Sequence, residues 1–426
     1  TMQGKIILKI LTICGVIYYT PPVTGVKPGG LSKLRTCLNE DTSQQDKEGL
    51  DPDVFGVDLF RSLAIGEPYN IITSPFSIWS VLVLGFYGSL GQTQKQLSQV
   101  LGVTNKVTTF SEVEKLRALL EDTPSHKAIL HLNNKGYFAS SLSMKVCIRD
   151  LIPNLKKIDF KDDAAAAAQK INNDVAKTTE GMIKEIVTGE DLQEASFVLL
   201  NAVYFKGVWE EPFDKLATKK KDFFGTDAQV MGQVEMMVDS NHHGKLVDIP
   251  ELKAQMVELE YADSSVSMFL FHTKEKDSSG IYSFDTLIEG LTPELFKNAI
   301  TQEKNDVFQL QIPKFKIETR IDDDLLKALK ALGITDLFDE NLANLTGFSS
   351  QPLHVKHVIH KAVIVVNEEG TEAAAASAME GMSRSASMPP TKKIFFNHPF
   401  VYLVYDKDAD VILFAGTFKD PNILDK

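Results

Sequence analysis

The sequence predicts an α+β fold, because helical patterns dominate the first part of the chain and strand patterns dominate the rest. Residues 74–90 are apolar nearly all round, which is typical of a buried central helix. Residues 195–209 form a long apolar run, which indicates a strand buried on both faces. No Pro-, Gly- or Ser-rich linker interrupts residues 50–365, so we expect one large domain over residues 51–426.

Helices are predicted where apolar residues recur at helical intervals. The first helix shows this spacing from Val54 to Ala64, and the pair Ser74 and Pro75 is a start signal for the second. The longest helical pattern is broken near residues 178–181. The predicted helices cover residues 52–66, 74–90, 91–103, 110–122, 164–187 and 322–333.

Strands are predicted where apolar residues alternate or run together over a short stretch. They cover residues 129–140, 195–209, 253–262, 266–273, 307–318, 354–367, 393–397, 400–406 and 411–418. Residues 368–390 follow one of these strands and consist mainly of small and polar residues. Their alanine run has neither the amphipathic pattern nor the caps of a helix, so we expect an exposed loop of unusual length.

The start of the chain predicts secretion. Lys5 precedes an apolar stretch from Ile6 to Tyr19 and then a small, polar region, a pattern typical of a signal peptide over residues 1–25. Residues 26–50 are polar and are expected to form a flexible lead-in. The apolar stretch is shorter than the ~20 residues of a membrane span, and no membrane partner is expected. The net charge of −12 argues against a general nucleic-acid binder.

Two cysteines would remain after such a leader is removed, because Cys14 would leave with it. In an oxidising compartment, Cys37 and Cys147 could pair and tether the N-terminal segment. The alternative is two free thiols, with Cys147 buried and Cys37 on a mobile tail. Asn344 begins an Asn-Leu-Thr glycosylation sequence, which fits a surface loop of a secreted protein.

The sequence shows no motif of a known catalytic or metal site. The stretch at residues 87–91 has tyrosine where a nucleophile elbow needs glycine, and no P-loop, dinucleotide-binding or H-E-x-x-H motif occurs. Strand alternation would separate the three histidines at 354–360. His242 and His243 lie in a polar stretch, expected to be a loop, without a ligand-type partner at useful spacing. We therefore expect neither an enzyme nor a metal site.

Four segments resemble, in family order, motifs of the serpins, a family of serine protease inhibitors. They are residues 70–103 (an early helix pair), 197–214 (a central-sheet strand), 358–378 (the strand and hinge before a reactive loop) and 395–421 (the C-terminal signature). The resemblance covers residues 50–422 and is strongest to secreted arthropod serpins, which often control clotting or immune protease cascades. It implies a large mixed central sheet, two smaller sheets, about nine helices and an exposed reactive-centre loop.

The resemblance implies that residues 368–390 are bait for a protease and insert into the large sheet after cleavage. Small residues suit a segment that must enter a closed sheet. Proline, which would remove a ladder donor, is absent between Glu368 and Met388. The implied hinge consists of Glu368, Glu369, Gly370, Thr371, Glu372, Ala373, Ala374, Ala375 and Ala376.

The family's usual count places the residue before the cleaved bond seventeenth, with Glu368 as the first. That residue is Arg384, followed by Ser385, and the acidic specificity pocket of a trypsin-like protease pairs with arginine. The expected partner is therefore a trypsin-like serine protease, held in a covalent complex. Met382 and Met379 would instead indicate a chymotrypsin- or elastase-like target. The alternative functions are a non-inhibitory carrier or chaperone of the same family and, less in keeping with the motifs, a hydrolase.

The resemblance also assigns roles to five residues outside the loop. Ser74, Ser77, Asn201 and His360 match a polar cluster beneath the point where the sheet opens, and Trp209 matches a tryptophan where the loop enters. A buried hydrogen-bonded cluster can hold two strands in one arrangement and still allow another. The simpler interpretation is ordinary satisfaction of core polar groups.

Two groups of lysines are candidates for binding a heparin-like polyanion, which many serpins bind. They are Lys219, Lys220, Lys221, Lys392 and Lys393. No other cofactor is expected. The resemblance implies a monomer.

Overall fold

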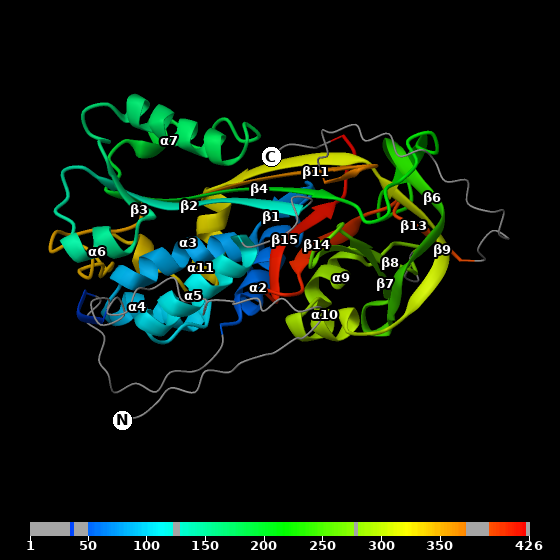
Figure 1. Ribbon diagram of the computed structural model, residues 1–426, viewed down its shortest axis with the longest axis horizontal. Helices are drawn as coiled ribbons and strands as arrows, with labels where there is room; N and C mark the ends of the chain where they lie inside the picture. The colour runs from blue at the N-terminus through cyan, green and yellow to red at the C-terminus, as the bar shows by residue number, and fades with distance from the viewer. Residues whose placement is uncertain (1–34, 38–49, 122–127, 277–279, 372–391, 423–426) are drawn as a thin grey trace, which may run out of the picture.

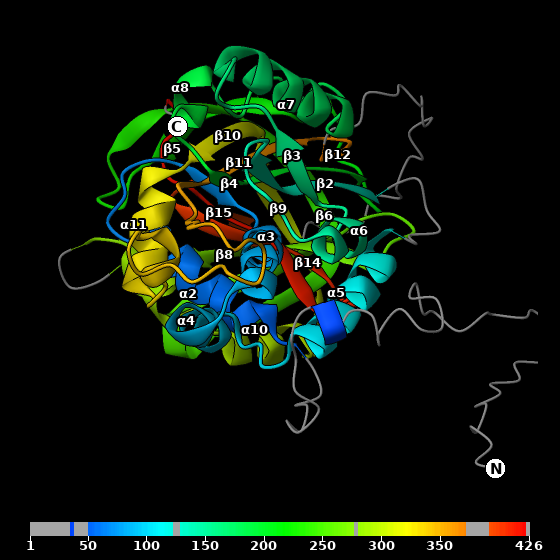
Figure 2. The same cartoon turned by 90° about the vertical axis from the view of Figure 1, so that its left-hand side faces the viewer.

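The computed structural model describes residues 35–37, 50–121, 128–276, 280–371 and 392–422, which form two β-sheets surrounded by helices (Figures 1 and 2). The predicted signal peptide and most of the predicted lead-in lie outside these residues. The α+β class is confirmed, and the helices lie mainly in the first part of the chain. No helix in the described ranges is long and apolar enough to cross a membrane.

The predicted helices are present, except that residues 182–187 of the longest one are not helical. Pro75 opens the buried central helix directly after Ser74, and the longest predicted helix ends at the expected break, at Thr178. The helices are α2 (Pro52–Ala64), α3 (Pro75–Gly88), α4 (Gly91–Leu101), α5 (Lys106–Glu121), α6 (Val146–Leu151), α7 (Ala164–Thr178), α8 (Gly189–Leu192), α9 (Phe284–Gly290), α10 (Pro293–Ile300) and α11 (Asp323–Ala331), with 3-10 turns η1 (Pro250–Leu252) and η2 (Asp336–Phe338).

The first sheet has six strands and is mixed. Their order is β10 (Phe315–Ile321), β11 (His357–Asn367), β12 (Gly370–Thr371), β4 (Phe197–Val208), β2 (Ala128–Ala139) and β3 (Leu155–Ile158). Strand β4 is buried along nearly its whole length, as its apolar run predicts. Helix α3 covers one face of the sheet and α7 the other, so β4 lies between two layers (Figure 2).

The second sheet has nine strands. Along its path lie β1 (Ile71–Thr73), β15 (Val411–Phe418), β14 (Phe400–Asp406), β8 (Val266–Thr273), β7 (Ala254–Glu260), β6 (Val230–Ile249), β9 (Asn305–Pro313) and β13 (Lys393–Phe395), and β5 (Lys219–Phe224) pairs with β6. Strand β6 is 20 residues long and pairs with β5 at its start, with β9 along its middle and with β7 at its end. The two smaller sheets implied by the resemblance are therefore continuous through one strand.

The prediction of a polar loop around His242 and His243 is wrong, because both residues lie within β6. Polar residues interrupt the alternation of apolar residues along this strand, so its sequence gives no clear period of two. Pairing with strands on both sides supplies the stability that its own pattern does not indicate.

A disulfide joins Cys37 to Cys147, with the two Cα atoms 5.8 Å apart. It attaches the segment at residues 35–37 to α6, and Cys37 is buried in the main core. Of the two alternatives for these cysteines, the structure has the paired form.

Candidate functional site

Strand β12 places Gly370 and Thr371, the third and fourth residues of the predicted hinge, between β11 and β4. Thr371 lies opposite Val366 of β11 and Gly207 of β4, and both pairings are antiparallel. Farther along, β11 and β4 pair directly with each other, in parallel, over seven residue pairs. The six-stranded sheet is thus parted at one end, which we call the head (residues 207–209 and 366–371), and β11 and β4 pair directly with each other over His357–Val363.

A tight turn leads from β11 into β12. The Asn367 side-chain oxygen accepts hydrogen bonds from the N–H groups of Glu369 at 2.9 Å and Gly370 at 3.2 Å. Gly370 has φ +151°, and a Cβ atom there would lie only 2.0 Å from the Gly207 carbonyl oxygen. Only glycine fits this approach of the turn to β4, so the predicted need for backbone freedom at Gly370 has a steric cause.

Thr371 is fully buried at the head of the sheet. Its hydroxyl lies 2.6 Å from the hydroxyl of Tyr261, in hydrogen-bond contact. The Tyr261 ring stacks on Trp209 with centroids 4.5 Å apart. Trp209 holds the turn directly, because its ring N–H donates to the Asn367 carbonyl and its backbone N–H donates to the Glu369 carbonyl, both at 3.0 Å. Trp209 therefore contacts the turn that leads from β11 toward the predicted loop.

Glu368 is a buried carboxylate with several partners. It accepts a hydrogen bond from the Thr218 hydroxyl at 2.9 Å and forms an ion pair with Lys314 at 3.2 Å. Burial by itself would raise the pKa of Glu368, but hydrogen bonds from its own backbone N–H, from Thr218 and from Lys314 outweigh burial and keep the pKa below its ordinary value. Its carbonyl accepts from Phe213 N–H at 2.8 Å, so both backbone and side chain are fixed.

The ion pair of Glu369 is more exposed than that of Glu368. Its carboxylate forms an ion pair with Lys215, whose side chain is 64% exposed. The remaining predicted hinge residues, Glu372 to Ala376, and the predicted bond Arg384–Ser385 lie outside the described residues. The site of cleavage therefore stays a prediction.

The predicted polar cluster is assembled farther down the same two strands. His360 of β11 lies opposite Asn201 of β4, and their side chains are hydrogen bonded. Asn201 also contacts Ser77, and the Ser77 hydroxyl donates to Asn134 of β2 at 2.7 Å. We call these residues, together with Ser74, the lock. Asn134 was not predicted, because only the antiparallel register of β2 and β4 brings it opposite Asn201.

His360 joins three elements through one neutral imidazole. Its Nδ1 contacts the Asn201 side-chain oxygen, and its Nε2 accepts the backbone N–H of Ser74, at the start of α3, at 3.2 Å. The Ser74 hydroxyl in turn donates to the Leu413 carbonyl of β15 at 2.6 Å. Burial lowers the pKa of His360 to about 3, which keeps the ring neutral and both hydrogen bonds in place at neutral pH.

The five candidate lysines do not meet in one patch. Lys219, Lys220 and Lys221 lie on β5, whereas Lys392 precedes β13 and Lys393 begins it, and β6 and β9 separate β5 from β13. Two of the five already have partners: Lys221 donates to Gln311 at 2.6 Å, and Lys392 forms an ion pair with Asp306. A single polyanion would have to span the sheet to reach both groups.

Asn344 lies partly buried before β11. Its side-chain oxygen accepts the Thr346 hydroxyl at 2.7 Å, and its backbone N–H donates to the Thr93 hydroxyl at 3.0 Å. The glycosylation of Asn344 stays a prediction.

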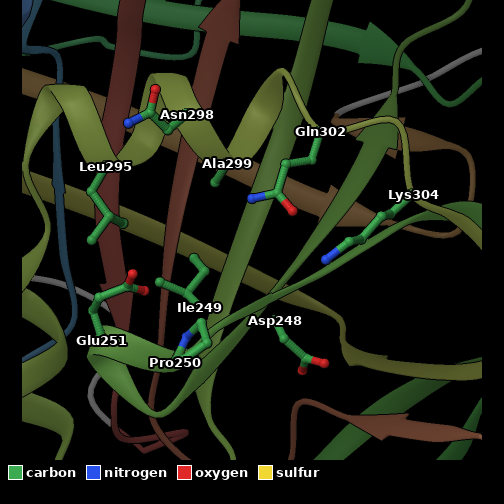
Figure 3. A pocket seen from close by; sticks show the side chains of 9 residues that line it. All are labelled: Asp248, Ile249, Pro250, Glu251, Leu295, Asn298, Ala299, Gln302 and Lys304. Atoms are coloured by element: carbon green, nitrogen blue, oxygen red, sulfur yellow. The ribbon is translucent and has the colours of Figure 1, made fainter.

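A cavity of about 440 Å³ lies between α10, η1 and the end of β6 (Figure 3). Its wall combines charged side chains, Asp248, Glu251 and Lys304, with apolar ones such as Leu295. No serine, cysteine or histidine is among the described residues that line it. A hydrolase needs a nucleophile close to a base, so this cavity does not support that alternative.

Comparisons with known proteins agree with these features. The family model described as Serpin (serine protease inhibitor) matches residues 51–421. Iripin-2 of Ixodes ricinus is 30% identical over 396 residues, which cover 91% of this chain and 96% of that protein. The leukocyte elastase inhibitor of Equus caballus is 33% identical over 386 residues, covering 86% and 97%. The solved structure of native protease nexin-1 with heparin is similar with a TM-score of 0.73, at 26% identity over 87% of this chain and 98% of that one.

Proposed function

This chain belongs to the serpin family of serine protease inhibitors, and from that premise we propose that it is a secreted suicide inhibitor of a trypsin-like serine protease. It is an inhibitor and not an enzyme. The observation that carries the proposal is the parted head, where Gly370 and Thr371 already occupy the position of a new central strand. Entry of the following residues would extend this strand between β11 and β4 toward the lock.

The direction of β12 gives this extension a driving force. Strand β12 is antiparallel to both neighbours, whereas β11 and β4 are parallel to each other. Insertion would replace one parallel ladder by two antiparallel ladders, which are slightly more stable per residue. Each added hydrogen bond contributes roughly 0.5–1.5 kcal/mol. An intact loop must still reach β13 at its far end, so full insertion waits for cleavage and the native state is kinetically trapped.

In the proposed reaction the protease serine oxygen attacks the carbonyl carbon of Arg384. The bond to Ser385 breaks, the amine of Ser385 takes the proton, and Arg384 stays joined to the protease as an ester. Water would normally hydrolyse this ester. Insertion competes with that step, because it carries the acylated protease away from its productive geometry before hydrolysis is complete.

Incubation with a panel of trypsin-like proteases tests the proposal. We expect a complex that survives boiling in SDS and a released peptide that begins at Ser385. Arg384→Ala should lose the complex with trypsin and keep its fold. A released peptide beginning at Ser383 or Glu380, with inhibition intact, would assign the bond to Met382 or Met379 instead. Cleavage without any complex would favour the carrier or chaperone function.

Secretion is supported by the leader pattern at residues 1–25 and by the Cys37–Cys147 disulfide, a bond typical of oxidising compartments. Polyanion binding rests on less. Lys219, Lys220 and Lys393 are exposed, and the similar protease nexin-1 structure is described with heparin. The parent protein should elute from immobilised heparin at a higher salt concentration than a variant with both Lys219→Ala and Lys220→Ala. Elution of the two proteins at the same salt concentration would argue against this site.

A further inference from the structure

Three residues that are far apart in the sequence meet beside the head. Glu211 follows β4, and Asp239 and His242 lie on β6. Residues 239 and 242 would point to opposite faces of a regular strand. A bulge prevents this, because three steps along β6 face only two along β9, from Leu310 to Phe308. One oxygen from each carboxylate and one ring nitrogen of His242 lie within 4.8 Å of one another.

The His242 ring is held in place by its surroundings. Its side chain is 7% exposed, its Nδ1 lies 3.2 Å from the Asp239 carboxylate, and its edge packs on Phe308. The other carboxylate oxygen of Asp239 accepts the N–H of Asn241 at 3.0 Å. Nε2 of His242 is buried and has no hydrogen-bond partner in the part of the chain that the structure describes. The ring nitrogen that faces the Asp239 carboxylate is therefore Nδ1, whereas Nε2 lies beside Gly244, where an added Cβ atom would be only 2.6 Å from it.

We propose that Glu211, Asp239 and His242 form a Zn²⁺ site. One imidazole with two carboxylates is a ligand set that suits Zn²⁺, whereas Ca²⁺ and Mg²⁺ prefer oxygen ligands alone. Ligand atoms around tetrahedral zinc lie about 3.4 Å apart, so the three groups need to draw together by only a short distance. Glu211 is exposed, and Asp239 and His242 are already in contact. The fourth position would be open to water.

The ion would link the two ends of the loop. Glu211 lies between Trp209 and Phe213, whose backbone N–H groups hold the carbonyls of Glu369 and Glu368. On the other side, β6 pairs with β9, and β9 pairs with β13, which follows the loop. Bound zinc would therefore connect the segment around Glu211, which holds the hinge, to β6 of the nine-stranded sheet. That sheet contains β13, which follows the loop. We expect bound zinc to raise the melting temperature of the intact protein. This expectation does not depend on which protease is inhibited.

Calorimetric titration of the full, tag-free chain with ZnCl₂ tests the site. We expect one ion per chain, no displacement by excess MgCl₂, and at least about tenfold weaker binding in Glu211→Gln. Two matched controls should bind like the parent. Glu210→Gln removes the neighbouring exposed carboxylate, and His243→Ala removes the exposed imidazole next to His242. Both control variants change exposed residues and leave the packed His242 ring in place.

The melting temperature gives a second readout. ZnCl₂ should raise it relative to EDTA in the parent and in both controls, and should leave it unchanged in Glu211→Gln. Equal binding in Glu211→Gln and the parent would overturn the proposal. So would loss of binding in His243→Ala, which would indicate a surface histidine site, or an absence of binding to the parent.

Discussion

The head and the lock hold the same two strands, β11 and β4, in opposite ways. At the head the strands are parted, and the hinge between them is held partly by exposed contacts such as the ion pair of Lys215 with Glu369. At the lock the strands pair directly, and His360 is fully buried. In the proposed mechanism, strand insertion would therefore begin where contacts are partly solvated, and the buried polar contacts of the lock would oppose its progress.

The largest effect is expected when a charged side chain replaces Thr371 at the head. Thr371 is already buried in the intact protein, so Thr371→Arg should expel β12 from the head. Insertion would then have to bury the charge again, at a cost of several kcal/mol that slows it by orders of magnitude. Protease should still cleave the loop but should rarely be trapped. The measurement is the number of inhibitor molecules consumed per protease inactivated, with Thr371→Ser as control. Efficient trapping by Thr371→Arg would contradict insertion at this point.

Cleavage of the loop should let β12 extend from the head to the lock, so that β11 and β4 are parted along their whole length. Extension of β12 between β11 and β4 would add about a dozen hydrogen bonds, each worth roughly 0.5–1.5 kcal/mol. At about 2–4 °C per kcal/mol for a large domain, the melting temperature should rise by tens of degrees. Calorimetry before and after cleavage measures this rise. An unchanged melting curve would support the non-inhibitory alternative.

Removal of the lock histidine should destabilise the intact protein. His360→Ala leaves the Ser74 N–H and the Asn201 side chain without their partner, and we expect a loss of about 3 kcal/mol in the free energy of unfolding. His357→Ala is the matched control, because His357 lies on the same strand but is only partly buried. Urea unfolding measures both. Equal losses in the two variants would show that the lock has no special role.

Acid should weaken the lock before it weakens the head. The folded-state pKa of His360, about 3, lies below its ordinary value of 6.5, so the unfolded chain binds the proton more readily and stability falls as pH decreases from about 6.5. The pKa of Glu368 is lowered from 4.5, so its contribution is lost only at more acidic pH. Urea unfolding from pH 7 to 5 should show a smaller slope in His360→Gln than in the parent. Identical slopes would argue against His360 as the group responsible.

The smallest effects are expected for the two lysines that form ion pairs with the hinge glutamates at the head. Lys314→Ala leaves the buried Glu368 carboxylate without its cation, but Lys314 is 39% exposed, and solvent screening limits the expected loss to about 1 kcal/mol. Lys215→Ala removes a solvated ion pair and should cause no measurable change. Thermal unfolding of both variants distinguishes them. A larger loss in Lys215→Ala would mean that the exposed contact matters more than the buried one.

The local pattern of the sequence predicted most elements but not their contacts. Nearly continuous apolar runs identified α3 and β4, because each is buried on nearly all sides and its own residues determine its type. Strand β6 was missed, because it is stabilised by neighbours on both edges rather than by an apolar pattern of its own.

Site residues divide in the same way. The resemblance singled out Trp209 and His360 through motifs, and in the structure Trp209 contacts the turn before β12 while His360 contacts Ser74. Tyr261, Lys314 and Asn134 were not predicted, because each reaches the site only through strand register or tertiary packing between segments far apart in the chain. Contacts of this kind leave no local signal.

The Cys37–Cys147 disulfide has a practical consequence for producing the protein. The bond joins residues 110 positions apart, and closing a loop of that length restricts the unfolded chain by an amount worth about 4–5 kcal/mol. Protein made in a reducing cytosol would lack this bond but keep the strands of both sheets. Its melting temperature would therefore be lower, although its fold would be the same. Expression host and reducing agent therefore belong among the variables to control, and recombinant batches should be compared for free thiols before their activities are compared.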